Sequence, residues 1–169
     1  MAEFPPAQIR PIAAEVAKLL KEKKESVSVA ETAAGGLISA ALIAQPGASA
    51  FYRGGLTLYT LESRVEYAGW TDADYKDYRG PTTDIVAGLA TTTRTKLDST
   101  YCVSESGTAG PTSPNRAAGY VALAVASEKG VFKKELSTGL GGDREGNMVA
   151  FAVEGLTLLR DVIKGDAKL

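Results

Sequence analysis

The sequence contains no histidine and only one cysteine, Cys102. Without histidine no Ser–His or Cys–His nucleophile pair can form, and the commonest ligand of transition metals is missing. A single cysteine cannot form an internal disulfide, which favours a reducing compartment such as the cytoplasm. We therefore expect no metal site and no cofactor. Acid–base chemistry near neutral pH would have to come from lysine, tyrosine, a perturbed carboxylate or water.

The chain also lacks a charge bias, a long apolar run and a leader-like beginning. Its 19 basic and 20 acidic residues leave a net charge of -1, which argues against a nucleic-acid partner. No apolar run approaches the ~20 residues of a membrane span, and residues 1–9 do not have the pattern of a secretion signal. With 169 residues and 44% hydrophobic content, we expect a single domain over residues 1–169.

Residues 27–36, Val-Ser-Val-Ala-Glu-Thr-Ala-Ala-Gly-Gly, combine a β-branched run with a turn of small residues. An apolar pattern at helical spacing follows over residues 37–44, which predicts a strand, a tight turn and a helix. The first turn of a helix leaves about four N–H groups unpaired, and anions bind there. This stretch is equally compatible with an anion site and with a closely packed corner that binds nothing.

Strand and helix patterns alternate along most of the chain, which is typical of a layered α/β fold. The last two predicted strands are joined by only a few residues, so they should be antiparallel and the sheet mixed. The predicted strands cover residues 26–30, 55–59, 100–106, 119–126 and 131–138. The predicted helices cover residues 11–24, 37–44, 60–68, 85–96 and 147–164, with Thr60 as an N-cap.

Three of the predicted strands end in polar or glycine-rich loops. In open α/β sheets, ligands bind beyond the carboxyl ends of the strands. If these strands are neighbours, Thr32, Tyr59 and Ser106 would face one crevice. The glycine-rich loop over residues 139–146, which carries Arg144, could close it.

Each of these residues also has a purely structural interpretation. Thr32 would cap the helix that follows it, and Ser106 would bond within its own loop. Tyr59 would belong to the core. Arg144 would pair with a neighbouring acidic residue, and Arg64 would lie on a solvated helix face.

The chain resembles the CinA C-terminal domain, or competence/damage-inducible, family over almost its whole length. The resemblance implies a three-layer α/β/α sandwich with a mixed, mostly parallel sheet. It rests on segments in matching order: Val29–Leu37, Pro46–Ser49, Tyr59 with its following helix, Ser106–Pro111, Gly119–Ala122 and Gly142-Asp143-Arg144.

Members of this family include amidohydrolases that convert the carboxamide of nicotinamide mononucleotide to a carboxylate, releasing ammonia without a metal. The resemblance implies a serine nucleophile where this chain has Thr32, and a lysine where it has Arg64. Tyr59 would assist the nucleophile. Threonine can attack, although its methyl group restricts it. Arginine stays protonated and cannot act as a base.

The same resemblance implies a small, phosphate-bearing substrate and a homo-oligomer. Three alternatives are compatible with the changed residues: a slow amidohydrolase, a non-hydrolytic nucleotide-binding or interaction protein, and a different reaction in the same pocket with Glu31 or Glu105 as base. The expected catalytic residues are Thr32, Tyr59 and Arg64. The expected substrate-binding residues are Ala34, Gly35 and Gly36 through their amides, Ser106, Gly107 and Thr108 of the third loop, and Arg144, with Arg64 also facing the phosphate.

Overall fold

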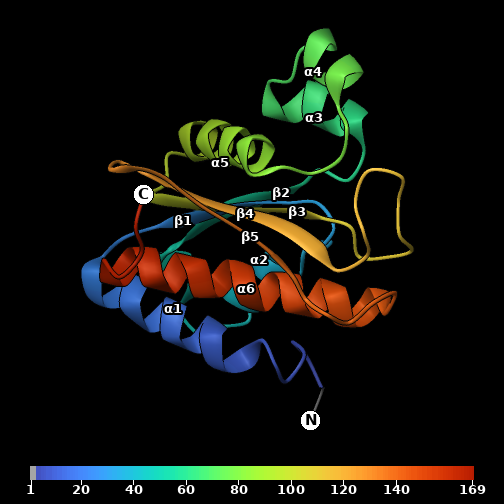
Figure 1. Ribbon diagram of the computed structural model, residues 1–169. Coiled ribbons are helices and arrows are strands. Elements are labelled where there is room, and N and C mark those ends of the chain that lie inside the picture. Colours follow the sequence, from blue (N-terminus) through green and yellow to red (C-terminus); the bar gives the residue numbers. More distant parts are fainter. Residues whose placement is uncertain (1–2) are drawn as a thin grey trace.

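The computed structural model describes residues 3–169 and shows a five-stranded sheet with helices on both faces (Figure 1). The strand order is β2-β1-β3-β4-β5. β1 pairs in parallel with β2 and β3, whereas β3–β4 and β4–β5 are antiparallel, so the sheet is mixed as predicted. The strands are β1 Val27–Glu31, β2 Tyr52–Thr57, β3 Tyr101–Gly107, β4 Tyr120–Ser127 and β5 Gly130–Ser137.

Helices α1, α2 and α6 cover one face of the sheet, and α5 covers the other (Figure 1). α3 and α4 lie beyond one end of α5, and together these layers form the expected α/β/α sandwich. The helices are α1 Arg10–Lys23, α2 Leu37–Ile43, α3 Leu61–Ala68, α4 Asp72–Asp77, α5 Thr83–Leu97 and α6 Arg144–Lys164, with a short 3-10 turn, η1, over Ala48–Ala50.

The burial of each element follows its sequence pattern. β1 is buried along its whole length because it is a central strand covered on both faces. β5 is an edge strand and exposes Lys133, Lys134 and Glu135, which protects its free edge from pairing with another chain. Apolar side chains fill the two layers between sheet and helices, with valines and leucines under α1 and α6 and mainly alanines under α5.

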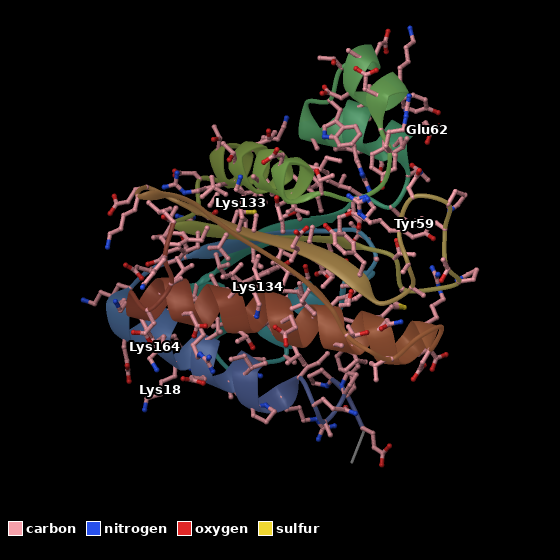
Figure 2. The ribbon with its side chains drawn as sticks, viewed as in Figure 1. Lys18, Tyr59, Glu62, Lys133, Lys134 and Lys164 are labelled. Carbon is pink, nitrogen blue, oxygen red and sulfur yellow. The ribbon has the colours of Figure 1, made fainter. Side chains whose placement is uncertain are left out.

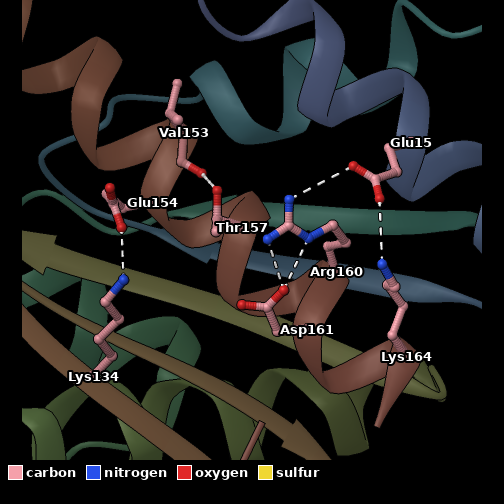
Figure 3. Close-up of polar contacts among 8 residues, drawn as sticks. All are labelled: Glu15, Lys134, Val153, Glu154, Thr157, Arg160, Asp161 and Lys164. Atoms are coloured by element: carbon pink, nitrogen blue, oxygen red, sulfur yellow. Dashed lines mark hydrogen bonds and ion pairs between the residues drawn. The ribbon is translucent and has the colours of Figure 1, made fainter. Parts of the chain in front are cut away.

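Ion pairs tie α6 to its neighbours at the surface (Figure 3). Glu15 of α1 lies 3.6 Å from Arg160 and 3.9 Å from Lys164, and Lys134 of β5 lies 2.8 Å from Glu154. Exposed pairs of this kind contribute about 0–1 kcal/mol each, so apolar packing is the main source of stability here.

Within residues 3–169, every helix falls short of the length and apolarity needed to cross a bilayer.

Several element boundaries differ from the sequence predictions, each for a local reason. The second strand is Tyr52–Thr57 rather than 55–59, because pairing with β1, from Val27 to Glu31, sets where it begins and ends. The segment 69–81 contains α4, which begins with a reciprocal capping box between Thr71 and Asp74. The last helix starts at Arg144 rather than 147, because the Asp143 side chain accepts a hydrogen bond from the Gly146 amide.

Candidate functional site

The loops after β1 and β3 meet because these strands are parallel neighbours. The Thr32 hydroxyl donates to the Ser106 hydroxyl at 3.0 Å. Only 3% of Thr32 and 2% of Ser106 is exposed, so the pair lies just beneath the surface. The contact joins two residues 74 positions apart, and neither hydroxyl is engaged as the local capping interpretation expected.

A second pair joins the loop after β2 to the start of α6. Tyr59 is 63% exposed and lies between α3 and the loop that follows β3 (Figure 2), so the core interpretation of this residue is wrong. Arg144 donates from Nη2 to the Tyr59 hydroxyl at 3.1 Å and from Nη1 to the Gly110 carbonyl. Arg144 therefore turns toward the loops instead of pairing with its acidic neighbours.

The two pairs remain distinct. Within residues 3–169 no hydrogen bond links the Thr32 hydroxyl to the Tyr59 hydroxyl, whose partner is Arg144. Proton transfer between Thr32 and Tyr59 would therefore require a side-chain movement or a bridging water.

A cavity of about 370 Å³ opens beside both pairs, a volume within the range of small-molecule sites. Arg144 is the charged residue of its wall, and no carboxylate from the described part of the chain lines it. Thr32, Ser106 and Arg64 do not line the cavity. The lining consists of Ala33, Tyr59, Tyr78, Gly80, Pro81, Gly107, Thr108, Ala109, Gly110, Pro111, Ser113, Asn115 and Arg144.

The small-residue turn before α2 is already filled by the chain's own carboxylates. Glu31 accepts from the amides of Gly36, Ile38 and Ser39 at 2.9, 3.1 and 2.7 Å. Glu105 accepts from the amides of Thr32 and Ala34 at 3.2 and 2.8 Å.

The amides of Ala34 and Gly36 were expected to receive a ligand anion, and the structure corrects this expectation. The Gly35 amide is also engaged, by the Thr32 carbonyl. Gly36 has a φ of 99°, which a residue with a side chain rarely adopts, so this glycine serves the turn itself. The helix dipole at this position favours negative charge, and the two glutamates supply it.

Glu105 is completely buried, on the sheet face opposite that of Ser104 and Ser106. Burial raises its pKa to about 7, and the negative charge of nearby Glu31 acts in the same direction. The turn amides oppose this by stabilising the carboxylate. One of its two oxygens, Oε1, has no hydrogen-bond partner within residues 3–169.

Arg64 is buried rather than solvated, with 3% of its surface exposed. Its Cζ lies 5.1 Å from the ring centroid of Trp70 and 5.2 Å from that of Tyr78, within cation–π distance. Nε donates to the Leu58 carbonyl at 3.3 Å, whereas Nη1 has no partner in residues 3–169. Arg64 does not line the cavity, so a direct contact with a phosphate bound there would require its side chain to move.

The third loop is held by close packing and by a buried asparagine. A Cβ on Gly107 would lie 2.6 Å from the Tyr120 carbonyl oxygen, so this position excludes a side chain. The Thr108 amide donates to the same carbonyl at 2.9 Å. Asn147 of α6 donates to the carbonyls of Ala109 and Gly141 at 2.8 and 2.9 Å, which ties two loops of the site together.

Sequence reasoning considered Glu31 and Glu105 only as possible bases of a different reaction, and it missed both their hydrogen bonds to the turn amides and the place of Tyr78. The single charged residue of β3 was a signal that could have identified Glu105 as a buried ligand of the turn. Tyr78 had no such signal, because it comes from a polar segment whose position depends on tertiary packing.

Within residues 3–169 no cluster of histidine, cysteine, aspartate or glutamate is arranged to hold a metal ion.

Fold and site together define an α/β/α domain with a ligand-sized cavity at the carboxyl ends of its parallel strands. The model of the CinA C-terminal domain family matches residues 9–163, and the chain belongs to this family.

Curated relatives and solved structures agree with this assignment. CinA-like proteins of Flavobacterium psychrophilum and Shewanella woodyi are 30% and 38% identical over 124 and 113 residues. These matches cover 72% and 66% of this chain but only 30% and 27% of the relatives' length, so the chain spans about a third of these proteins.

Two crystal structures have the same fold. The competence/damage-inducible protein CihA from Agrobacterium tumefaciens is 25% identical and superposes with a TM-score of 0.86, covering 97% of this chain and 99% of that one. A CinA superfamily protein from Klebsiella pneumoniae is 21% identical with a TM-score of 0.86, covering 93% of this chain and 98% of that one.

Proposed function

We propose that this chain binds a small, phosphate-bearing molecule of the nicotinamide mononucleotide type in the cavity beside Arg144. The observation that carries the proposal is the charge of the wall, which contains Arg144 and no carboxylate from residues 3–169. Tyr59 and the Gly110 carbonyl hold the guanidinium in place. A guanidinium fixed in this way suits the geometry of a phosphate, and charge-assisted hydrogen bonds are the stronger kind.

Calorimetric titration with nicotinamide mononucleotide tests this proposal. An Arg144→Met variant should lose about 10- to 100-fold in affinity, since a hydrogen bond to a charged group contributes about 1.5–3 kcal/mol. Arg79→Met is the matched control, because it removes the same charge from an exposed residue outside the wall. No binding to the unmodified protein, or equal losses in both variants, would contradict the proposal.

Amide hydrolysis is the second candidate, and the Thr32–Ser106 pair favours it. Thr32 and Ser106 directly precede Ala33 and Gly107 in the chain, and these two neighbours line the cavity. In this reaction the Thr32 hydroxyl would attack the carboxamide carbon with help from Tyr59. The C–N bond would break, and the NH2 group would leave as ammonia with the proton given up by the Thr32 hydroxyl. Water would then hydrolyse the resulting ester to the carboxylate and restore the hydroxyl. Because Arg64 cannot act as a base, we expect turnover slower by about two to four decades than with a lysine base.

An ammonia-release assay separates a slow enzyme from a non-hydrolytic nucleotide-binding protein. Thr32→Val should abolish turnover, and the double change Thr32→Ser with Arg64→Lys should raise it. Binding without ammonia release above buffer, in both the unmodified and the double-variant protein, would identify a binding protein.

We further propose the reducing cytoplasm as the location of this protein, given the single buried thiol of Cys102. We also propose a homo-oligomeric state, which sedimentation would test.

A further inference from the structure

We infer that Tyr78 determines ligand specificity by stacking against a planar aromatic ring, and that Arg64 positions Tyr78 from behind. This inference rests on the proposed function, because it assigns the part of the cavity that would take the ring of a nucleotide-type ligand. Tyr59 already bonds Arg144 at the anionic end, so the ring of Tyr78 is the other aromatic surface in the wall.

Tyr78, Arg64 and Trp70 form a compact cluster in which each group lies beside the other two. Tyr78 is half-buried and lines the cavity, whereas Arg64 is buried and does not. Arg64 lies within 5.2 Å of the Tyr78 ring centroid and within 5.1 Å of the Trp70 ring centroid. The two rings are 6.0 Å apart at an interplanar angle of 49°. Tyr78 therefore separates Arg64 from the cavity.

The backbone alone does not account for the position of Tyr78. This residue ends α4, which has only six residues and no buried side chain. α4 is thus weakly anchored: the Tyr75 hydroxyl donates to Glu62 of α3 at 2.9 Å, and Arg64 of α3 contacts the ring of Tyr78 at the C-terminal end of α4. Arg64 is in turn oriented by the Leu58 carbonyl, at the point where the chain leaves β2.

This arrangement gives Arg64 a role that does not require it to accept a proton. The described residues provide no carboxylate within ion-pairing distance of its guanidinium, and Nη1 is buried without a partner. Its interactions are therefore chiefly with the aromatic faces, which a planar guanidinium suits better than an ammonium does.

Two probes that share a phosphate and a ribose test the inference: nicotinamide mononucleotide, which has an aromatic ring, and ribose 5-phosphate, which has none. Tyr78→Leu should weaken binding of the first by about three- to tenfold, the effect of losing one aromatic contact, and change the second by less than about twofold. Tyr78→Phe keeps the ring and should bind both probes normally. Tyr67→Leu is the matched control, since Tyr67 is an exposed tyrosine of α3 outside the cavity.

Arg64→Met should reproduce the ring-selective loss, and Arg64→Lys should restore only part of it. A residue that serves stability alone would weaken both probes together, so this selectivity is the signature of positioning. Trp70 is the only tryptophan, and its emission should change with nicotinamide mononucleotide but not with ribose 5-phosphate.

Equal effects of Tyr78→Leu on both probes, or no effect on either, would overturn the inference while leaving the proposed function intact. Failure of both probes to bind the unmodified protein would overturn the proposed function and this inference with it.

Discussion

Replacing Glu105 with glutamine should stabilise the protein at alkaline pH and leave it nearly unchanged in acid. Glu105 is fully buried, and one of its oxygens accepts from the amides of Thr32 and Ala34. The glutamine carbonyl can accept the same two hydrogen bonds. Its NH2 group would take the place of Oε1, which has no partner within residues 3–169. The substitution therefore removes a titrating charge and preserves the shape of the turn.

The magnitude follows from the pKa of Glu105, which rises from an ordinary value of 4.5 to about 7 because burial penalises the charged form. An acid whose pKa is raised in the folded state contributes its full stability below about pH 4.5. It loses that stability as the pH rises through about 7. A pKa difference of about 2.5, at about 1.4 kcal/mol for each pKa unit, amounts to about 3.5 kcal/mol in all, of which about 3 kcal/mol is lost between pH 4.5 and 8.

Urea denaturation followed by far-UV circular dichroism, at several pH values between about 4.5 and 8, measures this effect. The free energy of unfolding of Glu105→Gln, minus that of the unmodified protein, should rise by about 3 kcal/mol across the range. All other titrating groups are common to both proteins and largely cancel. Glu128→Gln, at an exposed position, should show no such change. Parallel pH profiles for Glu105→Gln and the unmodified protein would refute the reasoning.

Two further substitutions test how the third loop is held. Asn147→Ala leaves the carbonyls of Ala109 and Gly141 without their donor and should cost about 2–3 kcal/mol in urea denaturation, with weaker binding of nicotinamide mononucleotide. Gly107→Ala places a Cβ 2.6 Å from the Tyr120 carbonyl oxygen and should lower stability by about 1–3 kcal/mol in the same assay.

Matched substitutions give these two tests their controls. Gly88 lies within α5 with open space around it, so Gly88→Ala should stabilise the protein by about 0.5–1 kcal/mol. Gln8→Ala removes an exposed amide side chain outside the cavity and should be nearly neutral in stability and in binding. If Gly107→Ala were as stable as Gly88→Ala, the third loop would be free to move, and the described packing against Tyr120 would not constrain it.

The sequence by itself determined the features that depend on neighbours along the chain. The alternation of strands and helices, the Thr60 N-cap and the antiparallel last pair of strands all follow from short-range patterns, and the structure confirms them. The ends of elements were less predictable where pairing with a distant segment sets them. β2 is an example, because its bounds are set by its pairing with β1.

Only the tertiary structure decided which charges are buried and which face the cavity. Arg64 reads as a surface residue from its acidic neighbours, yet the packing of Trp70 and Tyr78 encloses it. The sequence of the turn before α2 is compatible with an anion site and with a packed corner, and only the structure shows that Glu105 reaches its amides from a strand more than 70 residues away. Burial and charge compensation depend on contacts between segments far apart in the chain, and a local pattern carries no information about such contacts.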